Sequence, residues 1–370
     1  MIFYFVPFFF LAILTWIESS KRFDYLIKNK YLYSLITLFF IIFVGFRYEI
    51  GCDWDQYALM FEKYSPNIIE IIKRGLFEKD IYGIYQELGH ILITKISQNI
   101  YILNLIYSIL FSLPLFYVCS TLKRRYFSIL ISYPYYIVVI GMGPIRQAAC
   151  ISILMLSILL VSKKKYYISF FLTIFSFLIH QFSILFNGLV YGSLFTDIQK
   201  IKFSRKIIFA VILISFIFMY CLPSIINKVI IYFTLYKKFD PNGIMLVAPA
   251  KSAILLWTMN FIPSFIYLKN KEKFNLDNNL NRIFTSFCIT GISLLPIVLI
   301  QSVVGYRLLL YIFPTSIYIT SIIPDLKLLN IKKNDMVNIL IGLAFISFII
   351  WLKFAFHSSC WVPYQNILFN

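Results

Sequence analysis

The feature that most limits how this chain can fold is a series of apolar runs, each roughly 15 to 20 residues long. In an α-helix such a run is close to the length that crosses the hydrocarbon core of a bilayer. About twelve candidate spans lie near residues 1–17, 31–46, 100–118, 127–143, 144–162, 167–180, 181–195, 207–222, 251–268, 283–300, 307–323 and 336–352. The chain is also 60% hydrophobic, beyond the range of soluble domains. We therefore predict an all-α, polytopic integral membrane protein with about 12 transmembrane helices.

The basic residues are concentrated in alternate loops between these spans. The loops at 18–30, 122–126, 163–167, 196–206, 269–282 and 324–335 hold 21 of the 34 lysines and arginines, and carry +14 of the net charge of +18. The positive-inside rule places these loops in the cytoplasm and both termini outside. A nucleic-acid partner is excluded, because it would need basic residues gathered on one soluble face.

No soluble module interrupts the series of spans, so residues 1–370 are predicted to form a single transmembrane domain. The first run lacks a preceding basic region and a following small-residue cleavage site, and is expected to be retained as a span. The longest external loops are expected near 47–99 and 223–250. Segments 68–76, 88–96 and 225–236 are amphipathic, which predicts short external helices lying in the membrane interface.

A dense group of charges follows the second span: Arg47, Glu49, Asp53 and Asp55 lie within nine residues. Two further arginines lie at the expected outer ends of spans, Arg146 beside Gln147 and Arg307 beside Tyr306. Interfacial snorkelling explains any one such arginine. Three such arginines lie on the external face, which the positive-inside rule predicts to be poor in positive charge, and together they indicate a binding site. The guanidinium fork matches the oxygens of a phosphate group. The sequence therefore predicts a pyrophosphate site at the outer surface.

Proton transfer requires an acid or base near such a site. Asp53, Glu87 and His180 are the candidates, since each lies at or near the outer end of a span. Asp53-Trp54-Asp55 also matches the short DxD pattern that holds a divalent ion in many glycosyltransferases, but a general base is the better interpretation, and no metal is expected. Cys52 and Cys360 both fall on the external side, where one disulfide is possible.

The segment Phe46-Arg47-Tyr48-Glu49-Ile50-Gly51-Cys52-Asp53-Trp54-Asp55-Gln56-Tyr57 resembles the Arg-Tyr-x-x-Gly-Thr-Asp motif of the EpsG family, membrane proteins of bacterial exopolysaccharide, capsule and O-antigen clusters. Shorter matches follow in the expected order at Glu87, Ile145-Arg146-Gln147-Ala148, His180, Tyr306-Arg307 and Val362-Pro363-Tyr364-Gln365. This chain departs from the pattern at Cys52, where Thr or Ser is usual.

The resemblance implies a GT-C-like membrane enzyme of the Wzy type, a glycosyltransferase of the bacterial cytoplasmic membrane. It would polymerise oligosaccharide units carried on undecaprenyl pyrophosphate, without a cofactor and in contact with membrane lipid and a possible chain-length regulator. It implies that Asp53, Glu87 or His180 acts as the base. It also implies that the substrate is bound by Arg47, Tyr48, Tyr57, Arg146, Gln147, Tyr306 and Arg307. The alternatives are an O-antigen ligase, a glycan O-acetyltransferase and a flippase for lipid-linked oligosaccharides.

Overall fold

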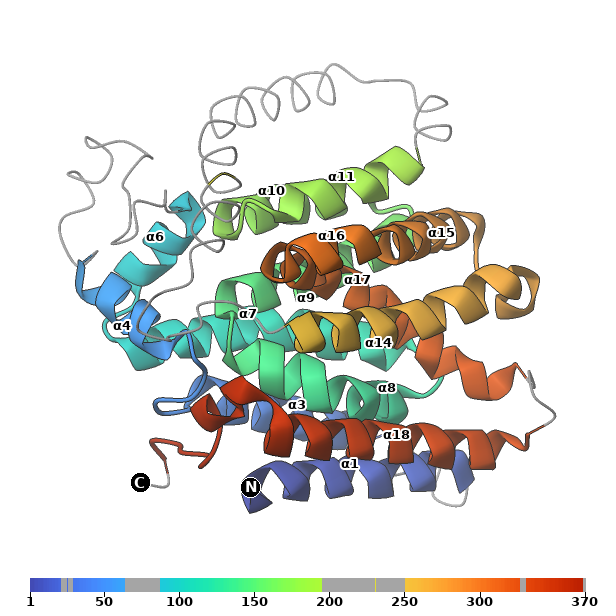
Figure 1. The fold of residues 1–370 in the computed structure, drawn as a ribbon, viewed down its shortest axis with the longest axis horizontal. Coiled ribbons are helices and arrows are strands. Elements are labelled where there is room, and N and C mark those ends of the chain that lie inside the picture. Colours follow the sequence, from blue (N-terminus) through green and yellow to red (C-terminus); the bar gives the residue numbers. More distant parts are fainter. Residues whose placement is uncertain are drawn as a thin grey trace.

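The computed structural model describes residues 1–20, 29–63, 87–194, 250–326 and 331–368, with the single residues 25 and 230. Within these ranges the chain is helical, and the all-α expectation is confirmed (Figure 1). The main helices are α1 (Ile2–Ser20), α3 (Lys30–Gly45), α4 (Trp54–Lys63), α6 (Leu88–Ile96), α7 (Ile100–Thr121), α8 (Arg125–Ser132), the π-helix η1 (Tyr133–Ile140), α9 (Ile145–Ser162), α10 (Tyr166–Ile179), α11 (Ser183–Ser193), α14 (Ala250–Lys269), α15 (Asn278–Ser293), α16 (Leu295–Ile300), α17 (Ser302–Ile322) and α18 (Lys333–Phe354).

Six helical segments are long and apolar enough to cross a membrane: Ile2–Ser20, Ile100–Thr121, Ile145–Ser162, Asn278–Ile300, Ser302–Asp325 and Lys333–Phe354. Four shorter apolar helices accompany them, at Lys30–Gly45, Arg125–Ile140, Tyr166–Ile179 and Ala253–Lys269. These ten match ten of the expected spans, and the protein is a polytopic membrane protein. For the run 181–195, α11 covers only 11 residues, which is about 16 Å of helix and too short to cross the bilayer core alone. The run 207–222 and the segments 68–76 and 223–249 lie outside the described residues, apart from Ile230.

The helices differ in how much of their surface is buried: one is central, and others face outwards. Helix α9 is apolar on all sides and buried along most of its length, where it packs against α7, α10, α15 and α17. Helices α1 and α18 instead leave rows of large apolar side chains uncovered, including Val6, Phe9, Ile13, Leu343 and Ile346. Contiguous apolar surface of this kind needs a hydrocarbon environment.

Described residues from three of the expected cytoplasmic loops lie together at one end of the bundle. Asp325 forms ion pairs with Lys123, Arg124 and Lys333, at 3.4, 3.3 and 2.7 Å. Glu18 at the end of α1 accepts hydrogen bonds from the first backbone amides of α8. These contacts join the loops at 18–30, 122–126 and 324–335, whereas the loop at 196–206 lies outside the described residues.

The two chain termini lie together at the opposite end, on the left of Figure 1. The Tyr4 hydroxyl donates a hydrogen bond to the Trp361 carbonyl at 2.7 Å, and its ring packs edge-on against Tyr364. Helices α4 and α6 lie at this end too. The candidate site is therefore to be sought here, far from the basic loops.

Helix α6 confirms that residues 88–96 are helical but orients them differently from a simple amphipathic helix. Leu92 and Ile96 are 43% and 74% exposed, whereas the polar His90 and Thr94 are 1% and 3% exposed. Two apolar side chains thus face outwards, as expected beside lipid, whereas the polar ones face the protein interior together with Ile91 and Ile93. A polar face buried at the end of a membrane bundle indicates a functional interior.

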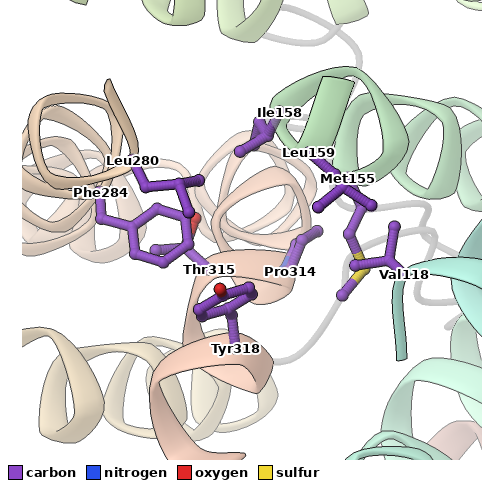
Figure 2. A pocket seen from close by; sticks show the side chains of 9 residues that line it. All are labelled: Val118, Met155, Ile158, Leu159, Leu280, Phe284, Pro314, Thr315 and Tyr318. Atoms are coloured by element: carbon purple, nitrogen blue, oxygen red, sulfur yellow. The ribbon is translucent and has the colours of Figure 1, made fainter. Parts of the chain in front are cut away.

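Figure 2 shows a pocket that does not belong to this end. Its lining is almost entirely apolar and comes from α7, α9, α15 and α17: Val118, Met155, Ile158, Leu159, Leu280, Phe284, Pro314, Thr315 and Tyr318. None of the candidate site residues lines it.

Candidate functional site

Arg47 organises the loop between α3 and α4 from within. Its side chain is 1% exposed. It donates hydrogen bonds to the carbonyl oxygens of Val44 at 2.9 Å and Ile50 at 3.1 Å, and to Asn104 Oδ1 of α7 at 2.9 Å. Burial lowers the Arg47 pKa to about 10, so the group remains charged at neutral pH. Sequence reasoning predicted a phosphate ligand, but this guanidinium is directed at its own loop.

Gly51 allows this loop to lie directly on the turn that precedes α9. Its φ is +96°, and a Cβ built on it would lie 2.2 Å from the carbonyl oxygen of Met142. Only glycine combines that backbone conformation with so close an approach. The motif glycine therefore seats the Arg47 loop against the turn at 141–144, which directly precedes α9 and its second residue, Arg146.

The C-terminal tail fastens the same loop from outside. Tyr48 N–H donates to the Gln365 carbonyl at 3.1 Å, Ile367 N–H to the Phe46 carbonyl at 3.0 Å, and Gly51 N–H to the Cys360 carbonyl at 2.8 Å. Cys52 and Cys360 form a disulfide across 308 residues. The possible pairing inferred from the sequence is thus present, and it accounts for a cysteine where the family pattern has Thr or Ser.

Arg146 lies on the first turn of α9 and meets Glu87 directly. Its Nη1 is 2.8 Å from Glu87 Oε2, and its guanidinium lies over the Tyr57 ring at 5.5 Å from the centroid. Glu87, at the start of α6, is 2% exposed. Gly89 places it there, because a Cβ at Gly89 would come within 2.7 Å of the Leu178 carbonyl at the end of α10. This ion pair lets the Glu87 carboxylate orient the Arg146 guanidinium.

His90 is a residue of this cluster that the sequence reasoning missed. It is 1% exposed, and its Nδ1 and the Tyr107 hydroxyl are hydrogen bonded at 2.8 Å. Its ring packs edge-on against Tyr57, with the centroids 6.0 Å apart. The available signal was its position three residues after Glu87 on an otherwise apolar helix, which puts both side chains on one face.

The second arginine pair forms between α9 and α17. Gln147 Nε2 donates to the Arg307 carbonyl at 2.7 Å, and Arg307 Nη1 lies 3.5 Å from Gln147 Oε1. Next to Arg307, the Tyr306 and Tyr135 hydroxyls are hydrogen bonded at 2.9 Å. The side chains of Arg307 and Arg146 are both half-buried. The structure thus brings Arg146, Gln147, Tyr306 and Arg307 to one place.

His180 ends α10, and its Nδ1 is hydrogen bonded to the Tyr311 hydroxyl of α17 at 3.0 Å. Its side chain is mostly buried, and its ring also contacts Phe182. The Tyr311 contact connects α10 to α17, four residues after Arg307, so His180 lies close to the second arginine of the site.

Asp53 contributes a half-buried carboxylate to this end of the molecule. It immediately precedes α4, and it lies within electrostatic reach of Arg47, Tyr57, Tyr306 and His357. Burial, followed by the nearby Asp53 carboxylate, raises the pKa of Tyr57, and Arg146 opposes this shift. Asp55 is exposed on α4. Among the described residues there is no group of three or more His, Cys, Asp or Glu side chains arranged to hold a metal ion.

A comparison with protein families identifies the family of the chain. The model of the EpsG family matches residues 30–366, nearly the whole chain. The chain belongs to the EpsG family. This family is associated with exopolysaccharide biosynthesis in membranes. No curated protein and no solved structure matches the chain, so the GT-C-like arrangement stays a prediction.

The two ends of the family match lie close to elements that build the site. The matched region begins at Lys30, where α3 starts, and ends at Asn366. Asn366 is the residue whose backbone pairs with Arg47 in an antiparallel bridge. The EpsG region therefore includes both the Arg47 loop and the tail segment that holds it.

Proposed function

We propose that this EpsG-family protein is a polymerase that joins oligosaccharide repeat units carried on undecaprenyl pyrophosphate. Support comes chiefly from one observation: Arg146 and Arg307, distant in sequence, both lie within electrostatic reach of Tyr57 at one end of the bundle, as does the half-buried carboxylate of Asp53. Two guanidinium groups suit a pyrophosphate, and a carboxylate suits a hydroxyl nucleophile.

The reaction assigns a role to each group. A hydroxyl oxygen of one repeat unit attacks the anomeric carbon of the growing chain, and the bond from that carbon to the pyrophosphate oxygen breaks. Asp53 takes the hydroxyl proton, and lipid pyrophosphate leaves with the bonding electron pair. Arg146 and Arg307 stabilise the negative charge that develops on it. Glu87 and Gln147 orient the two arginines.

We place this end of the molecule at the outer face of the bacterial cytoplasmic membrane, with both termini external. Two independent features favour this orientation. Three of the basic loops meet at the opposite end, as the positive-inside rule requires of the cytoplasmic side. The Cys52–Cys360 disulfide lies at the site end, and disulfides persist outside the reducing cytosol.

The decisive experiment is to analyse the surface glycan of cells that lack the protein. A polymerase leaves single repeat units, full-length glycan without acetyl groups indicates an O-acetyltransferase, and loss of all surface glycan indicates a flippase or a ligase. Full-length glycan of normal composition would overturn the proposal.

Site variants then test the assignment of residues. Arg146→Gln, Arg307→Gln and Asp53→Asn, each expressed in these cells, are expected to lower polymerisation by at least about a hundredfold, the order of effect of removing one transition-state charge partner. Arg125→Gln is the matched control, because Arg125 lies at the basic end and stacks on Tyr33 and Tyr126. Full activity of Arg146→Gln or Arg307→Gln protein at normal abundance would exclude that arginine from the site.

A further inference from the structure

Three aromatic rings form a cluster at the outer end that the site described above does not use. Tyr48 lies in the Arg47 loop, Trp54 begins α4 and Tyr101 lies in the first turn of α7. The ring centroids are 6.2 Å apart for Tyr48 and Trp54, 6.4 Å for Tyr48 and Tyr101, and 6.3 Å for Trp54 and Tyr101. We call these three residues the aromatic platform.

The Arg47 guanidinium holds one side of the platform in place. The Arg47 guanidinium lies over the Trp54 ring at 5.8 Å from its centroid, and the same guanidinium is anchored by three hydrogen bonds to the protein. Trp54 is thereby largely buried, while Tyr48 and Tyr101 keep part of their surface exposed. The rings are held in place before any ligand arrives, so little conformational entropy is lost on binding.

Carboxylates flank the platform. Glu49 and Asp55 are both exposed, one on each side of Trp54 in the sequence. The Glu49 carboxylate accepts a hydrogen bond from the Tyr48 hydroxyl, which raises the pKa of Tyr48. The Tyr48 and Tyr101 rings lie at 27° to each other, with Trp54 tilted against both. Aromatic faces edged by hydrogen-bond acceptors match the two kinds of surface of a sugar ring: its apolar C–H face and its rim of hydroxyl groups.

The platform is also close to the arginines. Trp54 and Tyr57 are three residues apart on α4, so they are neighbours along one face of that helix, and Tyr57 lies beneath the Arg146 guanidinium. A ligand whose phosphate meets Arg146 would therefore extend its next groups towards the platform.

We propose that the aromatic platform is a saccharide subsite, which stacks a pyranose ring of the oligosaccharide unit one or two sugars from the pyrophosphate. The inference rests on the proposed function for the identity of the ligand, but the binding of sugar can be measured without any polymerisation. The competing interpretation is a belt of aromatic side chains that sit at the level of the lipid headgroups and bind no sugar.

The test uses full-length protein in detergent and free oligosaccharides, released by mild acid from the surface polysaccharide of the producing cells. These probes carry neither lipid nor pyrophosphate. Binding is measured by calorimetry. Tyr101→Ala is expected to weaken binding about tenfold, and Tyr101→Phe, which keeps the ring, to retain most of the affinity. Tyr117→Ala is the matched control on the same helix, because Tyr117 is exposed near the basic end beside Lys163.

The outcomes separate the two proposals. Equal oligosaccharide affinity of the wild type and Tyr101→Ala, or no binding by the wild type, would overturn the platform and favour the aromatic belt. Weaker binding by Tyr101→Ala supports the platform even if cells lacking the protein still make full-length glycan, a result that would refute the polymerase alone.

Discussion

Replacing Gly51 by alanine is the sharpest perturbation of the site's construction. The added Cβ would lie 2.2 Å from the Met142 carbonyl oxygen, about 1 Å closer than close C···O contacts of roughly 3.3 Å. An L-residue at the φ of +96° costs about 1–2 kcal/mol, and relieving the overlap costs about 1–3 kcal/mol more. We therefore expect a loss of about 2–5 kcal/mol of stability, and a displacement of about 1 Å of the loop that carries Asp53. A displacement of that size lowers catalysis by about a hundredfold.

Two measurements check this prediction. Thermal denaturation of the protein in detergent reports the stability loss, and gel analysis of surface glycan, normalised to the amount of protein in the membrane, reports the activity. Gly342→Ala is the control, because no atom lies within 4 Å of the Cβ it would add to α18. It should be neutral or slightly stabilising, since alanine favours helix more than glycine by about 1 kcal/mol. A Gly51→Ala protein with unchanged melting temperature and full-length glycan would refute the reasoning.

Three further predictions concern the same end of the molecule. Arg47→Met should reduce the amount of folded protein, because it leaves the buried Asn104 amide and two carbonyl oxygens without their donor; normal abundance with no activity would instead indicate that Arg47 contacts substrate. Cys52→Ser, Cys360→Ser and the double variant should lose the same stability, about 2–4 kcal/mol, since all three remove one bond; labelling of wild-type Cys52 by maleimide without reductant would contradict this. Burial lowers the pKa of His357 below its usual 6.5, so the unfolded chain takes up that proton first, and stability should fall as pH drops below about 6.5. His357→Gln should flatten that decline in melts between about pH 7.5 and 5, and equal slopes for the two proteins would contradict the assignment.

The site illustrates how far the sequence reasoning reached. Arg146, Gln147, Tyr306 and Arg307 were each chosen because a polar side chain followed or preceded an apolar run, and the structure brings them together. The apolar runs next to each of these residues were enough to predict that it lies at the end of a span. The contacts of each side chain could not be predicted in this way, because they involve residues far away in the sequence.

Glu87 and Arg47 show the consequence. The sequence predicts Glu87 as a candidate base, and only the structure shows that its carboxylate pairs with Arg146, 59 residues away. Arg47 was a candidate phosphate ligand, yet its nearest acceptors are its own loop and Asn104. His90 was overlooked because an isolated histidine in an apolar helix has no meaning until its neighbours Tyr57 and Tyr107 are known.

By itself, the sequence determined the membrane environment, the helical class, the position of ten spans and the gathering of basic loops at one end. These depend on hydropathy, on helix length and on charge near the bilayer, all of which are properties of neighbouring residues. Only the tertiary structure decided that residues 160 positions apart pair at Gln147 and Arg307, and that a disulfide spanning 308 residues holds the tail on the Arg47 loop. Such pairings depend on how helices pack against one another, and a sterically forced contact such as that of Gly51 with Met142 exists only once they have packed.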